Sequence, residues 1–342
     1  MENKTILVSG GAGYIGSHTV VELFKAGYQA IIVDDFRASS ERMITGVQDL
    51  IQTDVKVYRI DICDKDKLEE IFASNKISGI IHFAALKAVG ESVEEPLMYY
   101  RNNLHGLINM VELADKYGVN NFVFSSSCTV YGEHKGTRKV HEGTPIGHTP
   151  SPYGATKQMG ERILQDCVNS SKLNLAVLSL RYFNPVGAHP SGLIGELPNG
   201  KPNNLMPFVT QTAAGIREKL TVFGNDYNTA DGTCIRDFIH VVDLAQAHVS
   251  GLEWLSTVEG SNMEFVNLGT GKGTSVLEII NNFEQLTGVN LNWEFGSRRE
   301  GDLEEIFAET KKAEELLGWK SKLTFKDAIV DAWNWEQKLM NE

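Results

Sequence analysis

The chain has 342 residues, 42% of them hydrophobic, and a formal net charge of -12 at pH 7. This length allows one large domain or two closely packed domains around a continuous core, and it excludes a small module stapled by disulfides. The acidic balance argues against nucleic acid or an anionic membrane as the main partner.

Cysteine usage and the N-terminal stretch bear on the compartment. The four cysteines form no C-x-x-C pair and none has metal-ligand spacing with a histidine, so we expect reduced thiols and no metal site. The N-terminus leads almost at once into a short apolar run, and no stretch reaches the ~20 apolar residues that a membrane span needs. We therefore expect a soluble cytoplasmic protein.

Short apolar runs alternate with longer amphipathic segments through the first half of the chain. The apolar runs, which we interpret as strands, span 5–9, 30–33, 55–60, 79–83, 122–125 and 176–180, and a helical pattern covers 14–25. Strands that are apolar throughout and separated by helices predict a parallel sheet covered on both faces. The expected fold class is therefore α/β, a doubly wound parallel sheet, with a first domain over 1–182.

Beyond residue 182 the amino-acid composition of the sequence changes. Glycine, proline and asparagine crowd the stretch 184–207, which predicts an irregular segment, and long irregular segments inside compact chains are usually functional. Shorter elements follow, with helices near 208–215, 275–286 and 325–338 and strands near 220–223 and 265–268. We expect a smaller C-terminal α/β lobe over 183–342 that is interleaved with the first domain.

The stretch GGAGYIG at 10–16 satisfies both G-x-G-x-x-G and G-x-x-G-x-x-G. Glycines there let the backbone approach a pyrophosphate, whose charge rests on the N-terminus of the following helix. Asp34 ends the next predicted strand, where a carboxylate bonds a ribose 2′-hydroxyl, and Asp35 beside it would repel a 2′-phosphate, which favours NAD over NADP. The alternative is that the glycines only turn a strand into a helix and that the aspartates begin a loop.

The stretch SPYGATK at 151–157 predicts a helix start, because proline in the first turn has its φ already set and loses no hydrogen bond. Tyr153 and Lys157 then lie one turn apart on the same face. A phenol titrates near ~10 and becomes a base at neutral pH only where positive charge stabilises its anion. The pair could move a proton, or it could be an ordinary pair on a solvated helix.

These motifs occur in one order with several others along the chain. The others are HFAALKAVGES at 82–92, SSSCTVYG at 125–132, RYFNPVGAHPSG at 181–192, PNNLMP at 202–207, FGNDY at 223–227, IRDFIHV at 235–241 and RREGD at 298–302. Together they resemble the extended short-chain dehydrogenase/reductases, and within them the UDP-glucose 4-epimerase (UDP-galactose 4-epimerase) family. The resemblance runs nearly end to end and implies a Rossmann-type first domain.

The resemblance implies a redox route to inversion at sugar carbon 4. Tyr153, as phenolate, takes the proton of the 4-hydroxyl while hydride passes to NAD, and the resulting 4-keto sugar turns over before hydride returns to its other face. Lys157 favours the phenolate, and Ser127, the last of three serines at a strand end, bonds the sugar oxygen or relays its proton. NAD is then expected to stay tightly bound, and UDP-galactose and UDP-glucose are the expected substrates.

Further positions match binding residues of that family. The implied cofactor contacts, in addition to the catalytic three, are Gly10, Gly13, Tyr14, Ile15, Gly16, Asp34, Asp35, Asp61, Ile62, Phe83, Ala84, Ala85, Lys87, Asn102 and Phe183. The implied substrate contacts, in addition to Ser127 and Tyr153, are Asn184, Asn204, Leu205, Thr221, Phe223, Arg236, Arg299, Asp302 and Ile306. Among them the arginines suit a diphosphate, because their fork matches phosphate oxygens.

The resemblance also bears on specificity and assembly. Ile306 falls where family members carry either a bulky aromatic that closes the sugar pocket or a smaller residue that leaves room for an N-acetyl group, and isoleucine lies between these extremes. We therefore predict some activity on UDP-N-acetylglucosamine. The family also implies a homodimer formed by two long helices near 98–117 and 153–168.

Three alternatives stay open beside this interpretation. A nucleotide-sugar dehydratase is disfavoured because Cys128-Thr129 stands where an Asp-Glu pair would be needed to expel water. A 4-epimerase for uronic acids remains possible, although the matched motifs of this chain contain no additional basic residue of the kind that a carboxylate would require. A catalytically silent NAD-binding sensor or scaffold is the third, although the catalytic tyrosine, lysine and serine are all present.

Overall fold

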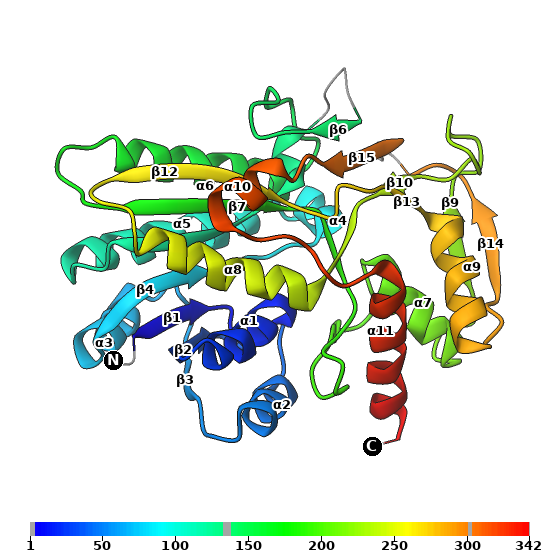
Figure 1. Ribbon diagram of the computed structural model, residues 1–342, viewed down its shortest axis with the longest axis horizontal. Helices are drawn as coiled ribbons and strands as arrows, with labels where there is room; N and C mark the ends of the chain where they lie inside the picture. Colours follow the sequence, from blue (N-terminus) through cyan, green and yellow to red (C-terminus); the bar gives the residue numbers. More distant parts are fainter. Residues whose placement is uncertain (1–3, 133–137, 300–302, 342) are drawn as a thin grey trace.

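The computed structural model describes residues 4–132, 138–299 and 303–341 and centres on a seven-stranded parallel sheet (Figure 1). The strand order is β3-β2-β1-β4-β5-β7-β12. The strands are β1 (Thr5–Ser9), β2 (Gln29–Asp34), β3 (Lys56–Arg59), β4 (Ile77–His82), β5 (Asn121–Ser127), β7 (Ala176–Tyr182) and β12 (Asn262–Leu268). The doubly wound parallel sheet predicted from the apolar runs is thereby confirmed.

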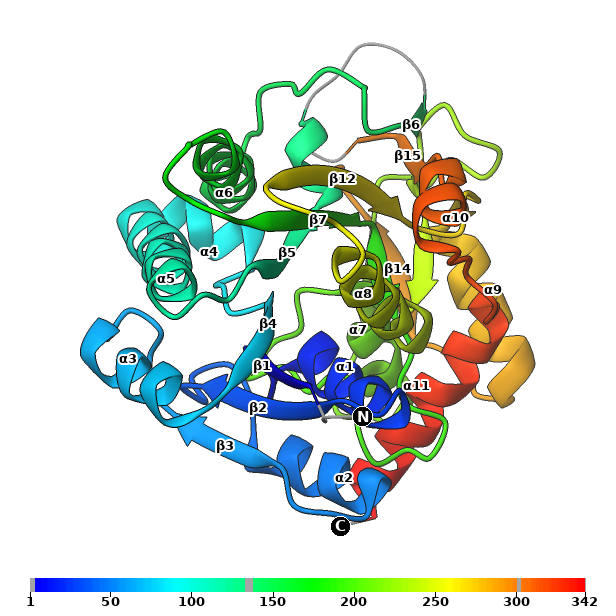
Figure 2. The same cartoon turned by 60° about the vertical axis from the view of Figure 1, so that its left-hand side comes forward.

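Helices cover both faces of this sheet, as Figure 2 shows. One face carries α3 (Lys65–Ser74), α5 (Pro96–Lys116) and α6 (Pro152–Val168), and the other carries α1 (Tyr14–Lys25), α2 (Glu41–Ile51), α8 (Val241–Leu255) and α10 (Lys311–Leu317). Side chains of a strand alternate between the faces, so Ile6 and Val8 join one apolar core and Leu7 joins the other. Burial on both faces explains why these strands are apolar throughout.

A smaller group of elements stands beside the carboxyl end of the sheet (Figure 1). It contains α7 (Leu205–Ala213), α9 (Val276–Thr287) and α11 (Phe325–Met340), around an apolar core of their own. Its short strands are β8 (Asn184–Val186) with β11 (Phe238–His240), β9 (Leu220–Phe223) with β14 (Trp293–Gly296), and β13 (Thr274–Ser275), β10 (Ile235–Arg236), β15 (Glu305–Ala308) and β6 (Lys139–Val140) in one sheet. The remaining elements are α4 (Val89–Glu94) and a 3₁₀ turn at Cys128–Tyr131.

One expected strand belongs to the large sheet and not to the smaller lobe in which we predicted it. The run at 265–268 was expected in the smaller lobe, but as part of β12 it pairs with β7 along its whole length, from Asn262 opposite Ala176 to Leu268 opposite Tyr182. Its apolar side chains Val266 and Leu268 are fully buried against the first sheet. The division of the chain into 1–182 and 183–342 stays a prediction.

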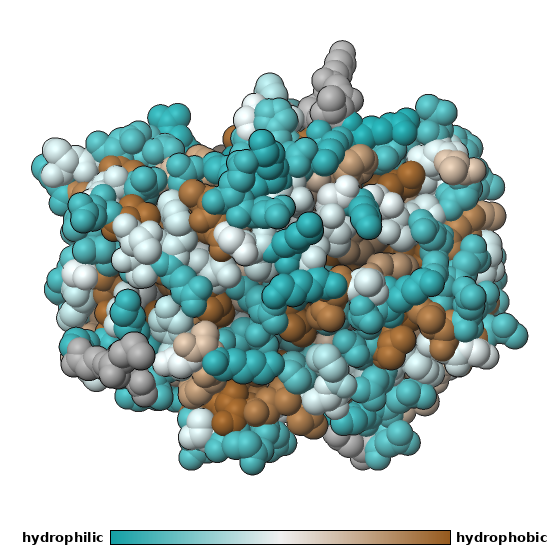
Figure 3. All heavy atoms as spheres, viewed as in Figure 1, coloured by the Kyte–Doolittle hydropathy of each residue, from teal (hydrophilic) through white to brown (hydrophobic). Residues whose placement is uncertain are grey.

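Polar side chains cover most of the face shown in Figure 3, and apolar ones lie among them in small groups. Across the residues that the structure describes, no helix combines the length and the apolar character needed to span a bilayer. The surface is thus that of a folded protein whose cores lie inside, between the sheet and its helices.

Candidate active site

The glycine loop joins β1 to α1 at the carboxyl edge of the sheet. Gly10 has φ +72°, and a Cβ there would lie 2.8 Å from the amide nitrogen of Ala84, while a Cβ on Gly16 would lie 2.2 Å from the carbonyl oxygen of Gly10. The first helical bond of α1 runs from Ser17 N to Gly13 O, at 2.9 Å, and its first turn carries no acidic residue. The amides of the first turn of α1, at residues 14–16, can therefore bind an anion, and the loop fits a dinucleotide diphosphate.

Asp34 ends β2 and holds the glycine loop in place. Its Oδ2 accepts from Ala12 N at 3.0 Å, and its Oδ1 accepts from Phe36 N at 2.9 Å and from Ser39 Oγ at 2.7 Å. Burial raises the pKa of Asp34, and these three hydrogen bonds act in the opposite direction. A carboxylate has about four acceptor sites, so room remains for one ribose hydroxyl.

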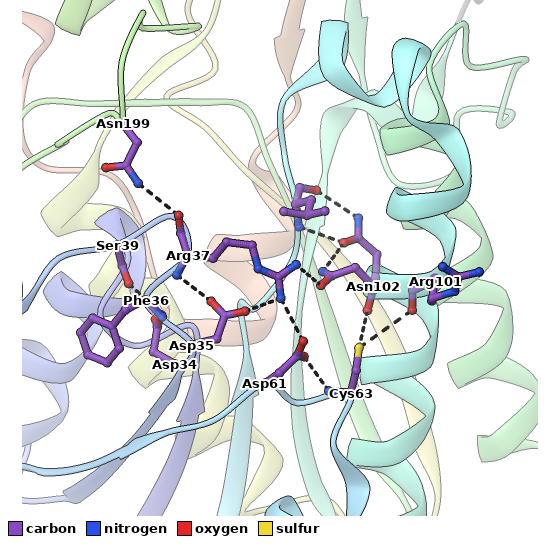
Figure 4. A network of polar contacts seen from close by, with 12 residues as sticks. Asp34, Asp35, Phe36, Arg37, Ser39, Asp61, Cys63, Arg101, Asn102 and Asn199 are labelled. Carbon is purple, nitrogen blue, oxygen red and sulfur yellow. Dashed lines mark hydrogen bonds and ion pairs between the residues drawn. The ribbon is translucent and has the colours of Figure 1, made fainter.

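Asp35, Asp61 and Asn102 gather at the next part of the same edge (Figure 4). They are joined by Arg37, whose Nη2 lies 2.6 Å from Asp35 and 2.9 Å from Asp61 and whose Nη1 lies 3.4 Å from Asn102. Arg37 is not among the residues that the sequence predicts for this site. No local pattern marks it, because its partner Asp61 is 24 positions away.

The other expected cofactor residues either follow strands of the large sheet or begin α1. Ala84 lies against Gly10, and Phe83 packs on His248 with ring centroids 4.7 Å apart. Ile62 is buried against Gly106, and Phe183 is buried after β7. Ala85 is half-buried on the same turn, and the hydroxyl of Tyr14 donates to Gly187 O at 2.7 Å.

Ser127 and Tyr153 meet where β5 ends and α6 begins. Ser151 caps α6, since its Oγ accepts from Gly154 N at 3.2 Å, and Pro152 occupies the first turn, as the sequence predicted. Tyr153 then lies near Ser127, close enough for the serine hydroxyl to lower the pKa of the phenol. The Ser127 Oγ also accepts from Thr129 N at 3.2 Å, which fixes its position.

Lys157 lies one turn further along α6 and is buried. Its Nζ donates to Ser125 O at 2.5 Å and lies 5.9 Å from the ring centroid of Tyr153. Burial lowers the pKa of Lys157 to about 8, although the nearby Glu161 carboxylate raises it. The ammonium is thus held below the tyrosine by a backbone carbonyl.

The electrostatics of the isolated chain keep the phenol of Tyr153 protonated. Burial raises the pKa of Tyr153 to about 12, even though the hydrogen bond from Ser127 lowers it. A further positive charge beside the hydroxyl is needed to bring this pKa toward neutrality. The expected catalytic set is therefore assembled, and it lacks only that charge.

A buried ionic network around Glu161 lies next to Lys157 on α6. Glu161, one turn after Lys157, accepts from Ser126 at 2.7 Å, from Ser179 at 2.9 Å and from two nitrogens of Arg181 at 2.8 and 2.7 Å. We had not predicted this network. Its signal in the sequence is the presence of serines and an arginine within otherwise apolar buried strands.

Glu196 joins an expected cofactor residue to an expected substrate residue. Its Oε1 accepts from Asn204 Nδ2 at 2.5 Å and lies 3.4 Å from Lys87 Nζ. Glu196 belongs to the irregular segment 184–207, which we expected to be functional, but the residue itself was missed. Its partner Lys87 is 109 positions away, so no local pattern pairs them.

The remaining expected substrate residues lie on the smaller lobe. Arg236 on β10 pairs directly with Ile306 on β15, and Ile306 is buried in a cluster with Val130, Tyr131 and Phe183. The guanidinium of Arg299 lies 6.0 Å from the ring centroid of Phe223. Thr221 shares β9 with Phe223, Asn184 begins β8, and Leu205 begins α7. Asp302 lies outside the described residues.

Comparisons with known proteins agree with this geometry. Residues 7–332 match the family model described as GDP-mannose 4,6 dehydratase. A UDP-glucose 4-epimerase of Bacillus subtilis is 48% identical over 98% of both chains. Two solved structures cover 99% of both chains, the Stenotrophomonas maltophila UDP-glucose-4-epimerase with bound NAD and formylated UDP-arabinopyranose (TM-score 0.95, 42% identity) and the Bifidobacterium longum UDP-glucose 4-epimerase with NAD+ and UDP (TM-score 0.93, 44% identity).

Cys128 and Thr129 follow the end of β5, at the place where the resemblance implies an acidic pair in a dehydratase, and burial raises the pKa of the Cys128 thiol to about 12. Full-length similarity at this level, together with the assembled tyrosine, lysine and serine, places the chain in the UDP-glucose 4-epimerase family.

Proposed function

We propose that the protein interconverts UDP-galactose and UDP-glucose by transient oxidation at sugar carbon 4, with NAD held as a tightly bound cofactor. The observation that carries this proposal is the gathering of Ser127, at the end of β5, with Tyr153 and the buried Lys157 of α6, whose Nζ lies 5.9 Å from the tyrosine ring centroid. A site that only bound NAD would have no need of this arrangement. Membership of the epimerase family supports the same reaction.

Side chains of the protein transfer the proton in this reaction. Tyr153 accepts the proton of the 4-hydroxyl and later returns it, while Ser127 holds the sugar oxygen or relays the proton. Bound NAD supplies the acceptor and donor of hydride at carbon 4, and its positive ring adds the charge that Tyr153 lacks in the chain alone. Inversion follows because the 4-keto sugar turns over before the hydride returns.

The smaller lobe holds the UDP part of the substrate. Arg236 and Arg299 are the cations for the diphosphate, because a guanidinium matches phosphate oxygens with two parallel hydrogen bonds. Asn184, Asn204 and Leu205 contact the nucleotide sugar, and the β9 edge at Thr221 and Phe223 lies beside the uracil. This lobe binds remotely from carbon 4, so its contacts position the sugar without taking part in the chemistry.

Assembly into a homodimer accounts for exposed apolar side chains on adjacent helices. Leu97 on α5 is 74% exposed, Val93 on α4 is 59% exposed, and Ile108 and Met159 on α5 and α6 are also exposed. The helices α5 and α6 pack side by side and would form a four-helix bundle with the same pair of a second copy. The protein acts in the cytoplasm, where its reduced cysteines and its cofactor fit.

The experiment that tests the function uses the protein purified without added cofactor. Its absorbance reports bound nicotinamide, and chromatography follows UDP-glucose after UDP-galactose is added. We expect conversion without added NAD and an absorbance signal of reduced cofactor when the sugar arrives. Bound NAD without conversion of either sugar would overturn the proposal, and UDP-glucuronic acid and UDP-N-acetylglucosamine would then be assayed in its place.

A further inference from the structure

Arg37 joins three segments at the carboxyl edge of the sheet with one guanidinium (Figure 4). It lies in the loop between β2 and α2, and its Nη2 donates both to Asp35, at the end of β2, and to Asp61, just beyond β3. Its Nη1 lies 3.4 Å from Asn102 on α5. Each of these three partners is an expected contact of NAD, whereas Arg37 itself has no assigned role.

The backbone of Arg37 makes a fourth connection. Its amide donates to Asp35 Oδ1 at 2.8 Å, and its carbonyl oxygen accepts from Asn199 Nδ2 at 3.1 Å. Asn199 belongs to the irregular segment that also carries Asn204. The loop that holds Arg37 is therefore tied both to the cofactor side and to the substrate side of the site.

The conformation of the loop sets the direction of the Arg37 side chain. Phe36, directly before it, has φ +60°, which is a left-handed conformation that bulky residues rarely adopt. The Phe36 amide is held by Asp34 at 2.9 Å, and the guanidinium of Arg59 lies 5.3 Å from the Phe36 ring centroid. A strained residue persists only where its surroundings fix it, so the placement of Arg37 is built into the loop.

The charges around Arg37 explain what the guanidinium does. Without it, the carboxylates of Asp35 and Asp61 would face each other and a dinucleotide that carries two phosphate charges. Each carboxylate also keeps acceptor sites beside its bond to Arg37.

We propose that Arg37 acts as a clasp over the adenosine end of the bound cofactor, joining the ends of β2 and β3 to α5 and so slowing the release of NAD. This inference rests on the NAD site of the proposed function. Arg37 is a positioning residue, because it acts on the cofactor through Asp35, Asp61 and Asn102 and does not touch the reacting atoms.

Salt dependence distinguishes a clasp from a merely structural residue. The side chains of Arg37, Asp35 and Asp61 are 45%, 30% and 40% exposed, so salt screens the ion pairs between them. Release of NAD from the wild-type protein should therefore accelerate as salt is raised. A variant without the guanidinium has no such pairs to screen and keeps only the repulsion between the carboxylates and the phosphates, which salt weakens, so its release should not accelerate with salt.

The test follows exchange of bound NAD for radiolabelled NAD in the purified holoprotein, at low and at high salt. We expect Arg37→Gln to exchange about tenfold faster than wild type at low salt, since it loses the ion pairs of one guanidinium to two carboxylates. Arg37→Lys keeps the charge but has no second nitrogen to reach Asn102, so its rate should lie between the two. The matched control is Lys65→Gln, which removes one positive charge and an exposed pair to Glu112, also on α5, and should exchange within about twofold of wild type.

Exchange of Arg37→Gln at the wild-type rate would overturn the inference, and so would an equal effect of salt on both proteins. Any activity that Arg37→Gln loses should return when NAD is added to the assay, because the clasp affects retention of the cofactor. Exchange is measured without a sugar substrate. A failure of the epimerase proposal would therefore leave the exchange result readable, and the two outcomes stay distinct.

Discussion

Arg181 and Glu161 form a forked ion pair one turn beyond Lys157 on α6, with nitrogen-oxygen distances of 2.8 and 2.7 Å and side chains only 3% and 4% exposed. Removing one partner leaves the other charge buried and unpaired. We expect Glu161→Gln to lower the free energy of unfolding by roughly 3–5 kcal/mol, measured by urea titration of the holoprotein.

The neighbouring residue supplies the control for that experiment. Arg162 pairs with Asp166 one turn along the same helix, but their side chains are 78% and 59% exposed. Arg162→Ala should therefore cost at most about 1 kcal/mol. Equal losses from the buried and the exposed pair would contradict the role we give to burial.

Replacement of Tyr153 by phenylalanine removes the hydroxyl that moves the proton and keeps the ring. We expect kcat for UDP-galactose to fall by about 10²–10⁴-fold while NAD remains bound, as measured by chromatography and by cofactor absorbance. Phe72→Leu, on the buried face of α3, changes an aromatic residue away from the site and serves as a control for folding. Full turnover by Tyr153→Phe would refute the catalytic assignment.

Buried histidines predict a loss of stability in acid. His248 is fully buried, its Nδ1 lies 2.8 Å from Leu244 O, and desolvation lowers its pKa from 6.5 to about 4. Because the unfolded chain takes up a proton near pH 6.5 and the folded chain does not, stability is full above pH 6.5 and falls as pH drops toward 4.

The matched variant is His248→Phe, which keeps an aromatic ring but cannot be protonated. Between pH 7 and pH 4 the wild-type protein should lose about 3 kcal/mol more unfolding free energy than this variant, as urea titrations at each pH would record. Parallel pH profiles for the two proteins would mean that His248 titrates normally in the folded state.

Ile306 predicts the range of sugars that the protein accepts. It is buried against Phe183 and Tyr131, and isoleucine is smaller than the aromatic residue that closes the sugar pocket in some epimerases. We expect measurable conversion of UDP-N-acetylglucosamine, followed by chromatography. Ile306→Tyr should lower this activity more than the conversion of UDP-galactose, since a tyrosine would fill the space that an N-acetyl group needs. Undetectable turnover by the wild-type protein, under conditions where UDP-galactose is converted, would show the prediction wrong.

Glu196 links an expected substrate residue, Asn204, to an expected cofactor residue, Lys87. Its carboxylate holds Asn204 at 2.5 Å and Lys87 at 3.4 Å, so Glu196→Ala should raise KM for UDP-galactose several-fold with a smaller effect on kcat. Glu196→Gln keeps an acceptor for Asn204 and should lie closer to wild type. Glu264→Ala breaks only a surface pair with Lys312 and serves as the control. A drop in kcat at unchanged KM would instead place Glu196 in the chemical step.

Local patterns made much of this molecule predictable from its sequence. Apolar runs give the strands because both faces of the sheet are covered, and Ser151 with Pro152 gives the start of α6 because capping depends on a few adjacent residues. The positions of Tyr153 and Lys157 follow directly from that start. The glycine loop is predictable for the same reason, since a Cβ on Gly10 or Gly16 would clash with nearby backbone atoms.

Contacts between residues far apart in the sequence were not predictable. Arg37 and Glu196 appear as ordinary surface charges until folding brings Asp61 and Lys87 to them. The sequence also suggested the smaller lobe for β12, which belongs to the large sheet. The apolar pattern of a single strand does not show which other strand it pairs with. Burial of Glu161 also depends on Arg181, which is 20 positions away.

The position of β12 has a consequence for synthesis of the protein. The strand β7 lies inside the large sheet only because β12, which ends 86 positions later at Leu268, covers its outer edge. While the chain emerges from the ribosome, that edge presents unpaired backbone groups and apolar side chains until Leu268 has been made. We expect nascent chains that stop between 182 and 262 to require chaperones and to aggregate, and aggregation through this edge to lessen once the chain extends past residue 268.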